Sequence, residues 1–254
     1  NIVRNLESLS ISKMLSPPYR RVLDLGCGDG RFFLDKFSRF TDECVGVDLS
    51  IEALKRHKKI SRYLHAPPYQ LVRSDARKLP FRKGSFDLVF LNCVLEHIVE
   101  DDEVLRCCAH VIEKDGEILV TVPNSEAKSQ DMKRLLFTRI GKLLLADSLR
   151  KFEHWSFANE YLSTVCYRQV RTGYDLQELA DKLEKCGLAV ESSRYYLSRP
   201  FILLFDLVSL TKLNRLHPSN LFLAAPFLHI LKSFDVGGPT SSGGLAVKAV
   251  KVDE

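Results

Sequence analysis

The sequence lacks the cysteine spacing and the long apolar runs that mark several protein classes. Its seven cysteines are an odd number and no two are spaced Cys-x-x-Cys, so a tetrahedral zinc site is not indicated and a full set of disulfides is impossible. No apolar stretch reaches the roughly 20 residues that a helix needs to span a bilayer. These absences predict a reduced, intracellular protein, and we expect it in the cytoplasm.

The chain also has little excess charge. It contains 37 Lys and Arg against 32 Asp and Glu, a net charge of +5 at pH 7. This mild excess requires no anionic partner, and the basic run 55–59 is expected to form a solvated helix face. No basic stripe interleaved with aromatics is present, so we expect no nucleic acid partner. A composition of 45% hydrophobic and 27% charged residues is that of a globular protein, which we interpret as one domain over 1–254.

Apolar strands alternate with helices in the first half of the chain. Strands are predicted at 21–25, 44–48, 69–73, 86–91 and 116–122. Ser50 is placed to cap a helix over 51–63, and Asp101 or Asp102 to cap another that ends at Lys114-Asp115-Gly116. This alternation indicates βαβ units and a doubly wound α/β sheet.

The pattern changes after Pro123. A basic and aromatic helical segment is expected over 125–170, followed by a helix over 174–186 that has Asp175 near its start. Two alternating runs, 188–196 and 245–252, predict the last strands. Between them, 197–243 holds two dense apolar helical stretches, about 201–216 and 219–234.

A glycine-rich turn follows the first strand, in Asp24-Leu-Gly26-Cys27-Gly28-Asp-Gly30. Glycines at such a turn let a ligand approach the backbone closely, and the next helix offers unpaired N–H groups. A dinucleotide fingerprint, G-x-G-x-x-G, would place its third glycine at position 31, which is Arg31. This difference disfavours an NAD-binding oxidoreductase.

The run Val22-Leu-Asp-Leu-Gly-Cys-Gly-Asp-Gly30 resembles the first motif of class I S-adenosylmethionine-dependent methyltransferases, and the resemblance extends to about Asn124. It is closest in kind to small-molecule enzymes of the ubiquinone and menaquinone biosynthesis type. The resemblance implies a seven-stranded, mostly parallel sheet of order 3-2-1-4-5-7-6 whose seventh strand is antiparallel. It also implies S-adenosyl-L-methionine as the cofactor.

The residues expected to bind the cofactor follow the ends of the predicted strands. They are Asp24, Gly26, Cys27, Gly28, Gly30, Asp48, Leu49, Asp75, Ala76, Asn92 and Cys93. A carboxylate at Asp48 can accept hydrogen bonds from two ribose hydroxyls. The resemblance implies that Asp75 and Ala76 contact the adenine and that Asn92 and Cys93 pass the methionine portion.

His97 is the candidate catalytic residue, because an imidazole of ordinary pKa can deprotonate a hydroxyl or amine. The alternative, a residue that only positions its loop, stays open. Some methyltransferases hold a divalent metal with ExxEH here, whereas this chain has Cys93-Val-Leu-Glu96-His97. Because Mg²⁺ prefers oxygen ligands, we expect no metal.

The acceptor is expected to contact the region after the fifth strand, with His154, Trp155, Phe157 and Tyr161 as candidates. An aromatic face packed on the sheet is the alternative for this set. For 197–243 three interpretations stay open: extra core or oligomer contact, a lid over an apolar acceptor, or a peripheral membrane contact through 201–234.

Together these features predict a methyltransferase that moves a methyl group to O, N or C of a small acceptor with a hydrophobic or lipid-linked portion. The rival from another class is a methyltransferase-like fold that binds or scaffolds without catalysis. The acceptor itself cannot be identified from the motifs, because in-line methyl transfer needs mainly alignment and the removal of a proton.

Overall fold

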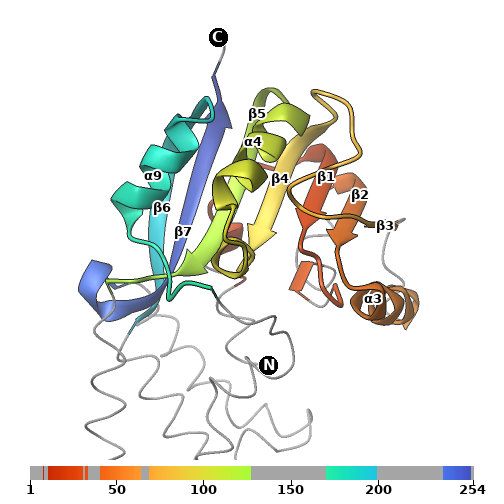
Figure 1. Cartoon of the computed structure of the whole chain (residues 1–254), viewed down its shortest axis with the longest axis horizontal. Helices are drawn as coiled ribbons and strands as arrows, with labels where there is room; N and C mark the ends of the chain where they lie inside the picture. Colours follow the sequence, from red (N-terminus) through yellow and green to blue (C-terminus); the bar gives the residue numbers. More distant parts are fainter. Residues whose placement is uncertain are drawn as a thin grey trace, which may run out of the picture.

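Seven strands form one sheet in the order β3-β2-β1-β4-β5-β7-β6, as the family resemblance implied. The computed structural model describes residues 8, 11–30, 32–33, 41–63, 69–126, 170–198 and 237–252. The strands are β1 (Tyr19–Leu25), β2 (Thr41–Asp48), β3 (Tyr69–Arg73), β4 (Phe86–Asn92), β5 (Ile112–Pro123), β6 (Leu188–Ser198) and β7 (Ser242–Lys251). Pairings from β3 through β5 are parallel, whereas β7 is antiparallel to both of its neighbours. In Figure 1 the arrow of β7 accordingly points opposite to that of β4.

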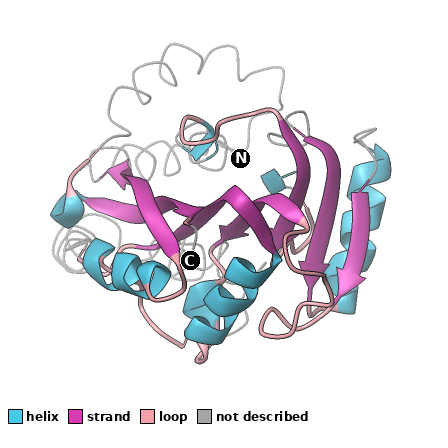
Figure 2. Ribbon diagram, turned by 90° about the horizontal axis from the view of Figure 1, so that it is seen from above, coloured by secondary structure: helices cyan, strands magenta, loops and turns pink. Residues whose placement is uncertain are grey.

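Three described helices flank this sheet: α3 (Ile51–Tyr63), α4 (Asp101–Val111) and α9 (Leu176–Glu184). Figure 2 shows α4 and α9 side by side on one face of the sheet. Their inward residues Val104, Leu105, Cys108, Leu179 and Leu183 recur at helical spacing and pack into one core cluster with the strands. On the other face a second cluster joins Ile11 and Met14 to residues of β1, β4 and β7.

Both boundaries of α4 differ from the sequence predictions. Glu100, not Asp101 or Asp102, is the N-cap of α4, because the Asp101 carboxylate is drawn into buried contacts with α9. The helix ends at Val111, and Lys114-Asp115-Gly116 lies inside β5, where the register against β4 shifts. Asp115 has φ +58°, so the turn predicted there became a bulge within the strand. Ser50 caps α3 as predicted, accepting a hydrogen bond from the Ala53 N–H at 3.1 Å.

The sheet order brings the candidate residues to one edge. Because β1, β2 and β4 are parallel, their carboxyl ends at Leu25, Asp48 and Asn92 align. β6 runs antiparallel to β7, hence parallel to β5, so its last residue, Ser198, also lies at this edge. Ligands of open α/β sheets bind at such an edge. No helix among the described ranges is both long and apolar enough to cross a membrane.

Candidate cofactor site

The glycine turn that follows β1 has three residues in the left-handed region of backbone conformation. Gly26, Gly28 and Gly30 have φ of +71°, +54° and +75°. The N–H groups of Gly26 and Cys27 both donate to the Val47 carbonyl, at 2.7 and 3.0 Å, which ties the turn to β2. A Cβ at Gly26 would lie 2.5 Å from Val94, whereas a Cβ at Gly28 would meet nothing within 4 Å. Gly28 therefore faces open space that a side chain would fill.

Asp48 is fixed at the end of β2 by two backbone donors. Its Oδ2 accepts from the Gly28 N–H at 2.9 Å, and its Oδ1 accepts from the Ser50 N–H at 2.8 Å. Each carboxylate oxygen can accept a further hydrogen bond. The carboxylate is thus oriented beside the glycine turn with acceptor capacity left for a ligand.

Asp75 lies just beyond β3 and is clamped by Arg77. The guanidinium of Arg77 approaches the Asp75 carboxylate to 2.6 Å and also pairs with Glu100. The side-chain and backbone hydrogen bonds from Arg77 lower the pKa of Asp75 to about 2. The carboxylate is therefore anionic at neutral pH. Ala76 packs partly buried against the core, and Leu49 stands 53% exposed beside Asp48.

Asn92 and Cys93 end β4 next to Thr121 of β5. The Thr121 hydroxyl donates to Asn92 Oδ1 at 2.6 Å, which fixes the orientation of the amide. The N–H of Cys93 donates to the Thr121 carbonyl at 3.0 Å, and Cys93 has φ +55°, uncommon for a residue with a side chain. This backbone turns sharply at the same edge as the glycine turn.

Asp24 is a buried carboxylate within β1 itself. It is 4% exposed and its Oδ2 accepts from the Tyr69 hydroxyl at 2.6 Å. Burial raises the pKa of Asp24 to about 7, and the negative charge of Asp48 adds to the rise, while the Tyr69 hydrogen bond lowers it. Near neutral pH this group is balanced between its two protonation states.

The space beside Gly30 is filled by a side chain that the sequence interpretation did not identify as buried. A Cβ there would lie 2.5 Å from the ring of His57, which is fully buried. The interpretation of 55–59 as an entirely solvated face was therefore wrong for His57. The spacing of Ala53, Leu54 and His57 on one side of α3 was the available signal, and all three are buried.

His97 ends a 3₁₀ turn, Leu95–His97, that follows the edge. Its side chain is 17% exposed, and Nε2 lies 3.9 Å from Oε1 of the buried Glu96. Among the described residues, no group of three or more His, Cys, Asp or Glu side chains is arranged to hold a metal ion.

The chain returns to this turn at residue 170. The N–H groups of Val170 and Arg171 both donate to the Glu96 carbonyl, and Tyr174 pairs with Pro123 and Ser125 through the backbone. The described ends of the predicted 125–170 and 197–243 insertions thus lie at the site edge. His154, Trp155, Phe157 and Tyr161, and the apolar stretches within 201–234, lie outside the described residues.

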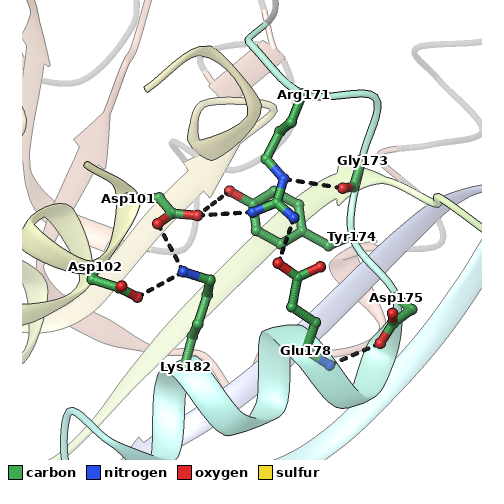
Figure 3. A network of polar contacts seen from close by, with 8 residues as sticks. All are labelled: Asp101, Asp102, Arg171, Gly173, Tyr174, Asp175, Glu178 and Lys182. Carbon is green, nitrogen blue, oxygen red and sulfur yellow. Dashed lines mark hydrogen bonds and ion pairs between the residues drawn. The ribbon is translucent and has the colours of Figure 1, made fainter. Parts of the chain in front are cut away.

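A buried polar network anchors this return (Figure 3). The Asp101 carboxylate accepts from Tyr174 Oη at 2.6 Å, from Lys182 Nζ at 2.8 Å and from Arg171 at 3.2 Å. The Arg171 guanidinium also lies 3.8 Å from the centre of the Tyr174 ring and pairs with Glu178. The network joins α4 and α9 to the segment 171–174, which lies just before α9.

Residues 23–120 match the protein family described as "Methyltransferase domain". This part of the chain is similar to a methyltransferase domain. The match runs from within β1 to within β5 and includes every candidate cofactor residue named above. The antiparallel β7, which lies between β5 and β6 in the sheet, is consistent with this match. It distinguishes the sheet from the dinucleotide-binding fold, whose strand order is 3-2-1-4-5-6.

Curated relatives and a solved structure agree with the domain. The malonyl-[acyl-carrier protein] O-methyltransferase of Legionella pneumophila is 32% identical over 144 residues, 56% of this chain and 43% of that protein. The ubiquinone biosynthesis O-methyltransferase of Bordetella avium is 30% identical over 146 residues, 54% of this chain and 56% of that one. The chain thus spans about half the length of these relatives.

The structure of phosphoethanolamine N-methyltransferase 2 from Haemonchus contortus, in complex with S-adenosyl-L-methionine, has the same fold. Its TM-score is 0.59 at 17% identity, and the alignment covers 97% of this chain and 52% of that one.

Proposed function

We propose that this protein transfers a methyl group from S-adenosyl-L-methionine to a small acceptor that has an apolar portion. The observation that carries the proposal is the pairing of an open glycine turn with an oriented carboxylate: Gly28 faces unfilled space, and its N–H holds Asp48 beside that space. The methyltransferase domain match over 23–120 supports the same cofactor.

The chemistry of the edge residues fits this cofactor. Asp48 offers acceptor capacity for the two hydroxyls of a ribose. Asp75, held anionic by Arg77, offers acceptors for an exocyclic amino group, and the exposed side chain of Leu49 offers an apolar surface for an aromatic ring. When bound, the cofactor supplies an electrophilic methyl group on a sulfonium.

We assign the removal of the acceptor's proton to His97. It lies on the turn after β4, and the buried Glu96 carboxylate, 3.9 Å away, favours the protonated imidazole that proton removal creates. Its Nε2 would take the acceptor's proton as the acceptor–methyl bond forms and the methyl–sulfur bond breaks. The products would be a neutral methylated acceptor, S-adenosylhomocysteine and a protonated His97. Oxygen is the acceptor atom we favour, because both curated relatives above are named as O-methyltransferases.

The apolar part of the acceptor is inferred from 201–234. Phe201, Phe205, Leu221 and Phe227 belong to a segment whose described ends, at Ser198 and 237, attach at the site edge. Burying a lipid or prenyl chain against such residues contributes roughly 0.8 kcal/mol per methylene. One curated relative is named for ubiquinone biosynthesis, which supports an apolar acceptor.

The test is transfer of labelled methyl from S-adenosylmethionine to cell extracts separated into lipid, glycan, RNA and small-molecule fractions. We expect label in the lipid or small-molecule fraction. His97→Ala should lower turnover about 10²- to 10⁴-fold while cofactor affinity stays close to wild type. Full turnover in that variant would leave His97 as a loop-positioning residue.

A binding or scaffold protein without catalysis is the competing outcome. It would bind the cofactor product S-adenosylhomocysteine in calorimetry and yet label no fraction. Label confined to RNA or glycan, or transfer to a fully polar acceptor by a variant that lacks 201–234, would contradict the apolar acceptor.

A further inference from the structure

Tyr69 reaches the Asp24 carboxylate by crossing a strand. Asp24 is paired with Gly46 of β2, and Tyr69 of β3 is paired with Cys44, two residues before Gly46. A side chain from β3 therefore has to pass over β2 to reach β1. Gly46 permits this, because a Cβ there would lie 2.5 Å from the Tyr69 ring. The hydroxyl completes the crossing with its 2.6 Å hydrogen bond to Asp24.

His57 holds the tyrosine from the helix side. Its ring centroid lies 4.4 Å from that of Tyr69, and on its other side it occupies the space beside Gly30. Burial lowers the pKa of His57 to about 4, so the ring is neutral at physiological pH. Phe33 contacts Tyr69 edge-on as well, with centroids 6.1 Å apart. The tyrosine is thus fixed between two rings and a glycine.

Few charges face Asp24 from the surrounding elements. Asp48 of β2 is the nearby anion, and Tyr69 of β3 is the hydrogen-bond donor. The thiols of Cys27 in the turn and Cys44 in β2 are also close, but burial raises the pKa of both, so they stay protonated. On the β4 side Asp24 is paired with the apolar Phe90. Among the described residues, the Tyr69 hydroxyl is the partner that favours the ionised carboxylate.

We propose that Tyr69 is a positioning residue for the cofactor. Tyr69 orients Asp24 beneath the glycine turn and favours its ionised form, and Gly46 and His57 support the ring of Tyr69. The proposal rests on the proposed function, since the ligand that an anion here would favour is the ammonium-bearing cofactor. The proposal adds Tyr69, a residue outside the glycine turn. It also gives Gly46 and Gly30 structural roles, because each leaves room for a neighbouring ring.

The sign of the pH dependence follows from the contacts. The ionised carboxylate of Asp24 attracts an ammonium group more strongly than the protonated carboxyl does. Cofactor affinity should therefore rise with pH through the pKa of Asp24. Tyr69→Phe keeps the ring between its neighbours but removes the hydrogen bond that lowers this pKa. The pKa of Asp24 then moves up, and the rise in affinity moves to higher pH with it.

The experiment is calorimetry with S-adenosylhomocysteine from pH 6 to pH 8.5 on wild type and Tyr69→Phe, with carbon NMR titration of the Asp24 carboxyl in the ligand-free proteins. The matched control is Tyr19→Phe, because Tyr19 also donates to a carboxylate, Glu117, but at the opposite end of β1. We expect the Tyr69→Phe curve to lie about one pH unit above wild type, with affinity about fivefold weaker at pH 7 and nearly equal at pH 8.5. Tyr19→Phe should match wild type.

Each outcome decides a separate point. Superimposed curves, or a loss of the same size at every pH, would overturn the positioning role. An unchanged carboxyl titration in Tyr69→Phe would overturn the control of Asp24 ionisation whatever the binding data show. Absence of S-adenosylhomocysteine binding by the wild type would instead overturn the proposed function and the cofactor part of this inference.

Discussion

At the scale of single residues, Asp24 links stability to the site. Its pKa in the folded protein, about 7, lies above the value of 3.8 for an unperturbed carboxyl, because burial disfavours the charge. The folded state therefore binds more protons than the unfolded state between these values, and the free energy of unfolding falls as pH rises through that window. Since one pKa unit corresponds to about 1.4 kcal/mol, the cost above pH 7 approaches about 4 kcal/mol.

Asp24→Asn should remove this cost while Tyr69 still has an oxygen to bond. We expect the variant's advantage in unfolding free energy to widen by about 2–3 kcal/mol from pH 5 to pH 8, measured by urea denaturation. Asp75→Asn is the control, because the pKa of Asp75 is lowered, to about 2, and its contribution is already complete at pH 5. Its loss of stability should be the same at both pH values. An equal gap for Asp24→Asn at pH 5 and pH 8 would contradict the assignment.

Gly30 offers a second test at this scale. Gly30→Ala combines a positive φ with a Cβ 2.5 Å from the buried His57 ring, so it should lower the free energy of unfolding by about 2–4 kcal/mol. Gly187 has the same φ of +75° but nothing within 4 Å of its Cβ position. Gly187→Ala should therefore cost about 1–2 kcal/mol, from the backbone alone. Equal losses in the two variants, in urea denaturation, would show that His57 does not restrict Gly30.

At the scale of elements, the contacts of α4 with α9 depend on one buried carboxylate. The Asp101 side chain is 6% exposed and accepts from Tyr174, Lys182 and Arg171 (Figure 3), whereas the neighbouring Asp102 is 54% exposed and, among the described residues, pairs with Lys182. Asp101→Ala removes the acceptor of the buried Tyr174 hydroxyl and one carboxylate partner each of Lys182 and Arg171, and should cost about 3–5 kcal/mol of unfolding free energy. Asp102→Ala should cost below about 1 kcal/mol. Similar values for both variants would contradict the role of the network.

The sequence predicted the elements better than the contacts between them. Apolar runs separated by glycine or helical patterns located all seven strands, and the family resemblance supplied their order. The predicted end of α4 was wrong, because the bulge at Asp115 is fixed by the pairing of β5 with β4. No local sequence pattern contains that pairing.

The site could be predicted only in part for the same reason. The positions of Gly26, Gly28 and Asp48 beyond or at strand ends are visible in the sequence, because alternation alone locates those ends. The crossing of Tyr69 over Gly46 to Asp24 depends on the register of three strands, and the burial of His57 depends on where α3 packs. These long-range facts are absent from any window of the sequence.

At the scale of the whole molecule, the sheet gathers chemistry from distant parts of the chain at one edge. The carboxyl ends of β1, β2 and β4 carry the candidate cofactor residues, and the described ends of the 125–170 and 197–243 insertions meet the same edge. We expect S-adenosylmethionine to bind at this edge, in the open space at Gly28.

The most direct test is calorimetry with S-adenosylhomocysteine on wild type, Gly28→Val and Gly187→Val. Both glycines have positive φ and nothing within 4 Å of a Cβ position, but only Gly28 lies at the proposed site. Wild type and Gly187→Val should bind the ligand, and wild type should give no heat with NAD. Gly28→Val should bind no S-adenosylhomocysteine, with its fold intact by circular dichroism, because the valine fills the space the ligand needs. Wild-type affinity in Gly28→Val, or no binding by the wild type, would contradict the account.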